Sequence, residues 1–331
     1  MSTSPGAKLD VPAEWAAAAA EIFQRGRATI LIIGRSGAGK TSFCRYLSEA
    51  LLQQQAEVAV VDADIGQAIL GPPATVTLGY PSLPVDFTTT TPAGYFFVGS
   101  TSPMGRLLPL VIGATSLARE ARAPFIIVDT TGLIHASGRV LKNYKIEAMR
   151  PDVVVALERR NELAPIRMAN RHVPFIRLKP SHAAHAKEDD EKFEVRAHAY
   201  ARHFAGAVRM ELSLDALIFQ RTLLFSGRPV AQEGAIHAEQ TAEGLLAVGA
   251  AAGAPADAKV LPAGFEKNLL CGIADETGRC RGLGIIETVD FAKHAIALIT
   301  PVKGEQVRIV QFGDQYVKPD GSELGQVKWG W

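Results

Sequence analysis

A glycine-rich stretch at residues 34–41, GRSGAGKT, constrains this chain more than any other feature. It fits the pattern of Gly, four residues, Gly-Lys and then Thr or Ser, which cradles phosphates between a strand and a helix. The apolar run at residues 28–33 predicts a buried strand before it. Apolar residues at helical spacing predict a helix over residues 41–55 after it. Residues 34–41, named here the phosphate loop, therefore predict binding of a nucleoside triphosphate.

The residue types of the phosphate loop suit a triphosphate with its metal ion. Glycines let the backbone bend so that successive N–H groups point into one concavity, at the positive end of the following helix. We expect Lys40 to place its charge on the β and γ phosphates and the Thr41 hydroxyl to ligate Mg²⁺. The expected nucleotide-binding residues are Gly34, Ser36, Gly37, Ala38, Gly39, Lys40, Thr41 and Ser42.

Composition limits the classes of protein that remain. The formal net charge of +1 gives no global basic field, so a nucleic-acid partner would need a local patch. Three cysteines without paired metal-type spacing suit a reducing cytosol. The chain shows no signal peptide and no run of apolar residues long enough to span a bilayer. We therefore expect a cytoplasmic protein without a membrane partner, and favour a monomer.

The length of 331 residues favours two domains, at residues 1–206 and 207–331. In the first, strands alternate with helices, which predicts an α/β fold of the P-loop NTPase type with a mainly parallel sheet. It begins with a helix near residues 11–15, where Asp10 could be the cap and Trp15 a packing residue. The expected strands are 58–62, 94–99, 125–129, 153–157 and 175–178, and the expected helices are 104–122 and a charged lid within about 180–206.

From about residue 207, short apolar runs are separated by turns, which predicts a small all-β barrel or sandwich. Residues 275–278 and 319–321 carry hairpin turn signals. The apolar runs considered are 223–225, 231 onward, 245–248, 268–273, 282–286, 295–299 and 307–312. Because the basic residues of this part are scattered, we favour a packing role for it over nucleic-acid binding.

Three acidic residues end or follow predicted strands, and so lie at the edge where open α/β sheets bind ligands. Phosphoryl transfer to a hydroxyl needs a carboxylate within reach of that hydroxyl. Asp64 is the first candidate for this carboxylate and Asp62 the second, with a role near the metal as the alternative for Asp62. Asp129 could hold the metal through water, but the pattern at residues 129–132, DTTG, also occurs in GTPases and cannot separate the classes.

Further motifs follow one another along the chain: VPAEW (11–15), the phosphate loop, VDADIGQ (61–67), GPP (71–73), FVGSTSP (97–103), TTG (130–132) and LGII (283–286). Through them the chain resembles the polynucleotide 5′-hydroxyl kinases related to the RNA kinase of the pre-mRNA cleavage machinery and the kinase of ribosomal-RNA processing. It is similar to their prokaryotic members over nearly its whole length. The DIGQ and GSTSP pieces are the specific ones.

The resemblance implies ATP- and Mg²⁺-dependent phosphorylation of a 5′-hydroxyl on RNA or DNA. It makes Asp64 the acceptor-activating carboxylate, beside Lys40, and implies metal ligation by Thr41, Asp64 and Asp129. Lid arginines over the transferring phosphate correspond to Arg196 and Arg202. The implied substrate-binding residues are Asp62, Gln67, Thr101, Ser102, Thr131 and Gly132.

The chain departs from this family pattern in two places, at Leu133 and in the acidic run at residues 188–191, which is unlike a plain nucleic-acid groove. Where family members often carry a base-stacking Trp, it has Leu133, with His135 nearby. His182, His185, His198 and His203 are interpreted as solvated side chains in preference to metal ligands.

Two other classes stay open. One is an ATPase or GTPase switch without an acceptor, although no guanine-reading Asn-Lys-x-Asp run is found. The other is a non-catalytic ATP-binding scaffold.

Overall fold

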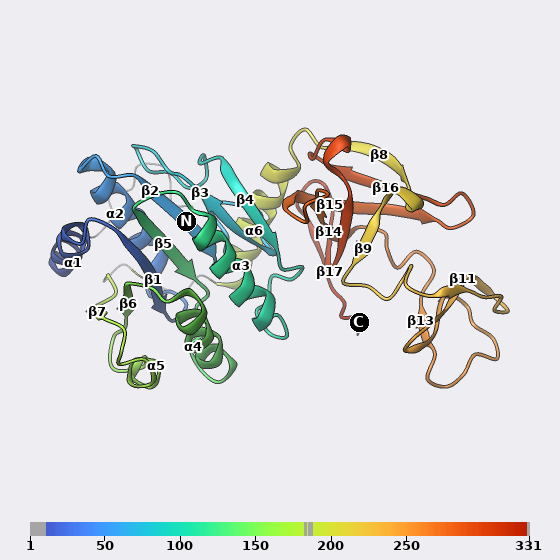
Figure 1. Ribbon diagram of the computed structural model, residues 1–331, viewed down its shortest axis with the longest axis horizontal. Coiled ribbons are helices and arrows are strands. Elements are labelled where there is room, and N and C mark those ends of the chain that lie inside the picture. Colours follow the sequence, from blue (N-terminus) through green and yellow to red (C-terminus); the bar gives the residue numbers. More distant parts are fainter. Residues whose placement is uncertain (1–10, 182–183, 185–187, 330–331) are drawn as a thin grey trace. The chain divides into compact units, whose positions relative to one another are not determined.

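The structure is a computed structural model that describes residues 11–181, 184 and 188–329 (Figure 1). Its contacts divide the chain into two compact units, Met1–Ala199 and Tyr200–Trp331. Helix α6 (Asp189–Phe204) runs across the division. The boundary of independent domains at residues 206 and 207 stays a prediction.

The first unit is built on a mainly parallel sheet, which confirms the predicted α/β fold. Across the sheet lie β4 (Pro92–Phe97), β3 (Thr75–Gly79), β2 (Val58–Ala63), β5 (Phe125–Thr130), β1 (Ala28–Gly34), β6 (Val153–Leu157) and β7 (Phe175–Leu178). The strands from β2 to β7 in this order are parallel, whereas β3 and β4 are antiparallel to their neighbours. The short strand β3 was not predicted.

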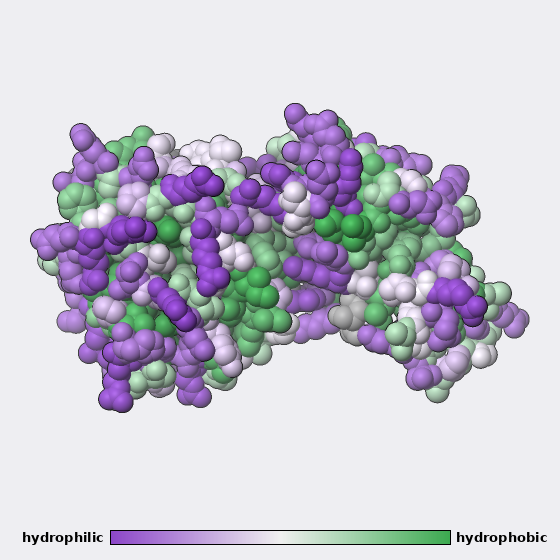
Figure 2. Space-filling view, viewed as in Figure 1, coloured by the Kyte–Doolittle hydropathy of each residue, from purple (hydrophilic) through white to green (hydrophobic). Residues whose placement is uncertain are grey.

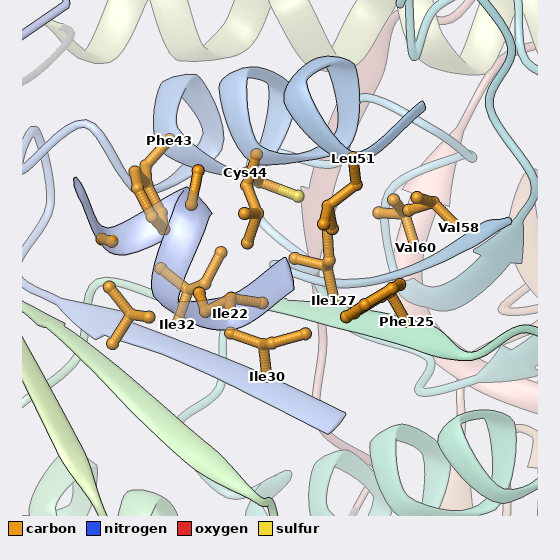
Figure 3. Packing of buried hydrophobic residues seen from close by; sticks show 14 of the residues in the cluster. Ile22, Ile30, Ile32, Phe43, Cys44, Leu51, Val58, Val60, Phe125 and Ile127 are labelled. Carbon is orange, nitrogen blue, oxygen red and sulfur yellow. The ribbon is translucent and has the colours of Figure 1, made fainter. Parts of the chain in front are cut away.

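Successive side chains of β1 pack alternately into two hydrophobic cores, one on each face of the sheet. Ile30 and Ile32 belong to a cluster with α1 (Ala13–Gln24) and α2 (Lys40–Gln53), part of which Figure 3 shows. Leu31 and Ile33 point to the opposite face, because side chains of a strand alternate. That face is covered by α3 (Leu107–Glu120), α4 (Ser137–Met149) and α5 (Ala164–Ala169).

Helix α1 confirms the packing interpretation of its tryptophan. Trp15 is fully buried and meets the ring of Phe43 edge-on, with ring centroids 5.2 Å apart. Pro12 occupies the N-cap position without a side-chain cap, and Asp10 lies outside the described residues.

Helix α4 is the largest element that the sequence did not predict. Its buried face carries Leu141 and Ile146, but also Lys142 and Lys145, both with no exposed surface. Two lysines at inward positions interrupt the apolar spacing by which a buried helix is recognised.

The second unit is all-β after the end of α6. Its larger sheet has β8 (Val208–Ser213), β16 (Ala295–Thr300), β15 (Cys280–Asp290), β14 (Leu269–Ala274) and β17 (Ile309–Val317), with β9 (Ile218–Gln220) and β18 (Glu323–Gln326) on β17. The smaller has β10 (Arg228–Pro229), β11 (Ala235–Thr241), β12 (Gly244–Gly249) and β13 (Lys259–Leu261). Short 3₁₀ turns lie at Leu214–Ala216 and Gly304–Gln306. The apolar run at 223–225 forms a turn, in which Leu224 is buried.

Both predicted hairpin turns are present. The amide of Gly278 donates to the Asp275 carbonyl between β14 and β15, and the amide of Gly321 donates to the Lys318 carbonyl between β17 and β18.

His203 corrects the interpretation of the histidines as solvated. Its Nε2 accepts a hydrogen bond of 3.0 Å from the Leu283 amide, and burial lowers the pKa of His203 to about 4. His198 is exposed, whereas His182 and His185 lie outside the described residues. Within the described ranges, no helix combines the length and apolar character that crossing a bilayer requires.

Candidate active site

The phosphate loop has the backbone of an anion cradle. Gly37 and Gly39 adopt left-handed φ angles of 70° and 81°, which L side chains rarely take. Helix α2 begins directly after Gly39, and no side chain caps its first turn. Its first amide groups therefore stay directed at the loop, where a phosphate can accept their hydrogen bonds.

Neighbouring segments press closely on this cradle. A Cβ on Gly34 would lie 2.7 Å from the Leu157 carbonyl oxygen, and a Cβ on Gly132 would lie 2.4 Å from the Ser36 amide nitrogen. A Cβ on Gly39 would meet that of Ala184 at 3.5 Å, an ordinary van der Waals distance. The close packing around the cradle therefore depends on the absence of a Cβ at Gly34 and at Gly132.

The two polar residues that end the loop are held by hydrogen bonds. Lys40 is buried and its ammonium donates to the Arg35 carbonyl at 3.2 Å, back across the loop. The Thr41 hydroxyl donates to Asp129 Oδ2 at 2.6 Å. A hydroxyl and a carboxylate side by side are the hard oxygen donors that Mg²⁺ prefers, so these residues fit the implied metal.

Asp62 lies opposite Asp129 in the parallel register of β2 and β5. Its carboxylate accepts hydrogen bonds from the amides of Asp64, Ile69 and Leu70, so it holds the loop after β2 in place. Burial raises the pKa of Asp62 to about 7, and the charge of Asp129 contributes to the rise. Burial also raises the pKa of Asp129, although Lys40 acts in the opposite direction.

Asp64 is only partly buried and stands at the start of a tight turn. Its Oδ1 accepts from the amides of Gly66 and Gln67, at 3.3 and 3.2 Å. A Cβ on Gly66 would lie 2.9 Å from the Thr101 carbonyl oxygen, so this turn packs on the hydroxyl-rich segment at residues 100–102. The structure thus places the turn of Asp64 and Gln67 against the backbone of Thr101.

Ser102 belongs to the same hydroxyl-rich segment. Its Oγ accepts from the Met104 amide, and Met104 Sδ in turn receives the hydroxyl of Ser137 at the start of α4. The beginning of α4 therefore lies next to the expected acceptor side.

Lys142 and Lys145 are site residues that sequence reasoning missed. Lys142 Nζ donates to the hydroxyls of Thr130 and Thr131 and to the Thr131 carbonyl, at 2.9, 3.2 and 2.6 Å. Burial lowers the pKa of Lys142 well below its usual range, and the charges of Lys145 and Lys40 lower it further. Burial lowers the pKa of Lys145 to about 8, against the attraction of Asp64 and Asp129. The sequence signal that could have identified them is their spacing of three residues, which puts both lysines on one face of a helix.

Not every predicted residue projects into this region. The Thr131 side chain is buried and bonded to Lys142, and Leu133 is partly buried. Arg196 places its guanidinium 4.5 Å from the ring centroid of Phe193 on its own helix. Arg202 is exposed and belongs to the second unit, so the lid role of both arginines stays a prediction.

A parallel sheet, a glycine cradle at the start of a helix, and a threonine–aspartate pair behind it define a P-loop nucleotide-binding protein. A family model described as the mRNA cleavage and polyadenylation factor CLP1 P-loop matches residues 34–206. The chain belongs to this family.

Similar proteins extend over the whole chain. It is 33% identical over 338 residues to a polyribonucleotide 5′-hydroxyl-kinase of Pyrococcus furiosus, covering 96% of this chain and 95% of that protein. A protein of the same name from Methanocaldococcus jannaschii is 31% identical over 89% of each chain. The solved Clp1p–Pcf11p (454–563) complex matches with a TM-score of 0.65 at 13% identity, over 92% of this chain and 79% of that chain. This last likeness shows a shared fold.

Proposed function

We propose that this protein is an ATP- and Mg²⁺-dependent polyribonucleotide 5′-hydroxyl kinase. The observation that carries the proposal is the position of Asp64. Its carboxylate stands at a partly open turn against residues 100–102 and interacts electrostatically with Asp129, which is bonded to Thr41. This arrangement supports a site that combines an acceptor carboxylate with the phosphate loop. The names of the full-length relatives agree with this assignment.

In this mechanism the phosphate loop binds the donor, and Asp64 serves both the metal ion and the acceptor hydroxyl. The phosphate loop and Lys40 bind the β and γ phosphates of ATP. Thr41 and Asp129 would hold Mg²⁺ with Asp64 nearby, and the bound ion would supply positive charge to the transferring group. The Asp64 carboxylate takes the proton of the 5′-hydroxyl while that oxygen bonds to the γ phosphorus. The bond to the β-phosphate oxygen breaks, and ADP leaves.

The surface beside the acceptor side supports a nucleotide substrate. Figure 2 shows an apolar area over the part of the first unit where Figure 1 draws α3. Its large exposed side chains include Met104 and Leu108, and Tyr144 of α4 is 57% exposed. Aromatic side chains stack on bases of any sequence, so Tyr144 is the candidate for the stacking role that Leu133 does not supply.

The test is transfer of labelled γ-phosphate from ATP to 5′-hydroxyl oligonucleotides. We expect RNA to be labelled, with DNA of the same sequence as the comparison and a 5′-phosphorylated RNA as the blank. Lys40→Ala and Asp64→Asn should lose transfer, whereas Asp190→Asn, at an exposed position of α6, should retain it. ATP hydrolysis without any labelled oligonucleotide would instead support a nucleotide switch. Full transfer by Asp64→Asn would remove the proposed base.

A further inference from the structure

Six charged side chains at the phosphate loop and the neighbouring strand ends influence one another electrostatically. Three are the aspartates already described, Asp62, Asp64 and Asp129. Three are lysines with little or no exposed surface, namely Lys40, Lys142 and Lys145. The acids raise one another's proton affinity by mutual repulsion, as the influence of Asp129 and Asp64 on Asp62 shows. The lysines therefore balance a repulsive cluster from within the protein.

The two lysines of α4 differ in one respect. Lys142 has three oxygen acceptors, which tie it to the strand end and exit turn of β5. The Lys145 ammonium is also fully buried but has no hydrogen-bonding partner among the described residues. Its favourable interactions are electrostatic, with Asp64 first, then Asp129 and Asp62.

An unpartnered buried ammonium opposes folding. Removing it from water costs free energy that hydrogen bonds at this position do not return. An apolar chain of the same length would fill the same space, since α4 packs here against a hydrophobic core. The placement of Lys145 is thus unfavourable as packing, but it sets a buried amino group on the same face of α4 as Lys142, which is bonded to the exit of β5, and there its charge attracts Asp64 and Asp129.

We propose that Lys145 is a positioning residue of the phosphoryl-transfer site. Its buried charge offsets the repulsion between Asp64 and Asp129, so that both carboxylates stay close enough to serve one metal ion and one acceptor hydroxyl. The inference rests on the proposed kinase function. Lys142 has a different task, because its hydrogen bonds hold the turn that contacts the phosphate loop through Gly132.

The experiment compares Lys145→Met with Lys142→Met in the full chain. Lys145→Met removes a charge without hydrogen bonds but leaves the carboxylates less compensated, so its urea midpoint should change less than that of Lys142→Met. Lys142→Met should unfold earlier, because Thr130 and Thr131 lose a shared donor. In the transfer assay Lys145→Met should lower kcat roughly tenfold or more and change KM for ATP less than about twofold.

A second readout does not depend on transfer. With one positive charge fewer, the carboxylates attract Mg²⁺ more strongly, so binding of a non-hydrolysable ATP analogue should need less Mg²⁺ for half-saturation. An unchanged kcat in Lys145→Met would overturn the proposal, and so would a loss of stability that matches Lys142→Met. If the unchanged protein labels no oligonucleotide, the kinase assignment fails by itself. The Mg²⁺ comparison then still decides on Lys145, since an unshifted half-saturation contradicts its role.

Discussion

Replacing Gly132 by Ala tests whether the exit turn of β5 supports the phosphate loop. Gly132 has no left-handed φ angle, so alanine is compatible with its backbone conformation. The added methyl group, however, would lie 2.4 Å from the Ser36 amide nitrogen and 2.6 Å from the Ser36 Cα. Both are backbone atoms, which cannot move aside as a side chain can.

The size of the effect follows from these distances. Ordinary van der Waals contact begins at 3.4 Å, whereas the added methyl group would lie 2.4 Å from the Ser36 nitrogen. The turn and the loop must therefore move apart to relieve this overlap. Overpacking of this kind costs about 1–3 kcal/mol of folding stability. The same displacement moves Ser36 within the cradle, and a tenfold loss of affinity corresponds to only about 1.4 kcal/mol. We therefore expect ATP affinity to fall roughly tenfold or more.

The assay pairs urea unfolding with equilibrium titration of a fluorescent ATP analogue. Gly304→Ala is the matched control, because a Cβ at Gly304 meets nothing within 4 Å and its φ angle is not left-handed. Should Gly132→Ala bind the analogue as tightly as Gly304→Ala does, the turn would not position the loop and the reasoning would be refuted.

Three further predictions concern other parts of the chain. Thr41→Val should weaken Mg²⁺-supported nucleotide binding at least about tenfold, because it removes the hydroxyl that donates to Asp129. Thr41→Ser keeps the hydroxyl and should retain binding. Equal binding by both variants would contradict this prediction. Trp15→Ala should cost about 3–5 kcal/mol in urea unfolding, since the ring is fully buried, and a loss below 1 kcal/mol would argue against the α1 packing. The lowered pKa of His203 makes the unfolded chain bind more protons between about pH 6.5 and 4, so stability should fall as the pH falls through that window. At pH 5 this amounts to about 2 kcal/mol relative to neutral pH, and His203→Gln, measured in parallel, should lack this part of the pH dependence.

Local signals were sufficient for the nucleotide half of the site. The glycines of the phosphate loop, the strand before it and the helix after it are neighbours in sequence, so their pattern and their structure coincide. The same holds for the carboxylates that directly follow or end β2 and β5. In a parallel sheet such strand ends meet at one edge, which placed Asp62 opposite Asp129.

Sequence by itself therefore determined the fold class, the phosphate loop and the acids beside it, because each depends on residues that are close together in the sequence. Tertiary structure alone decided that α4 turns Lys142 and Lys145 inward, and that Gly132 and Gly66 admit no side chain. It also decided that His203 accepts a hydrogen bond from a strand 80 residues away. Burial and close approach depend on which distant segments meet, and charged or glycine residues look the same in a sequence whether water or protein surrounds them.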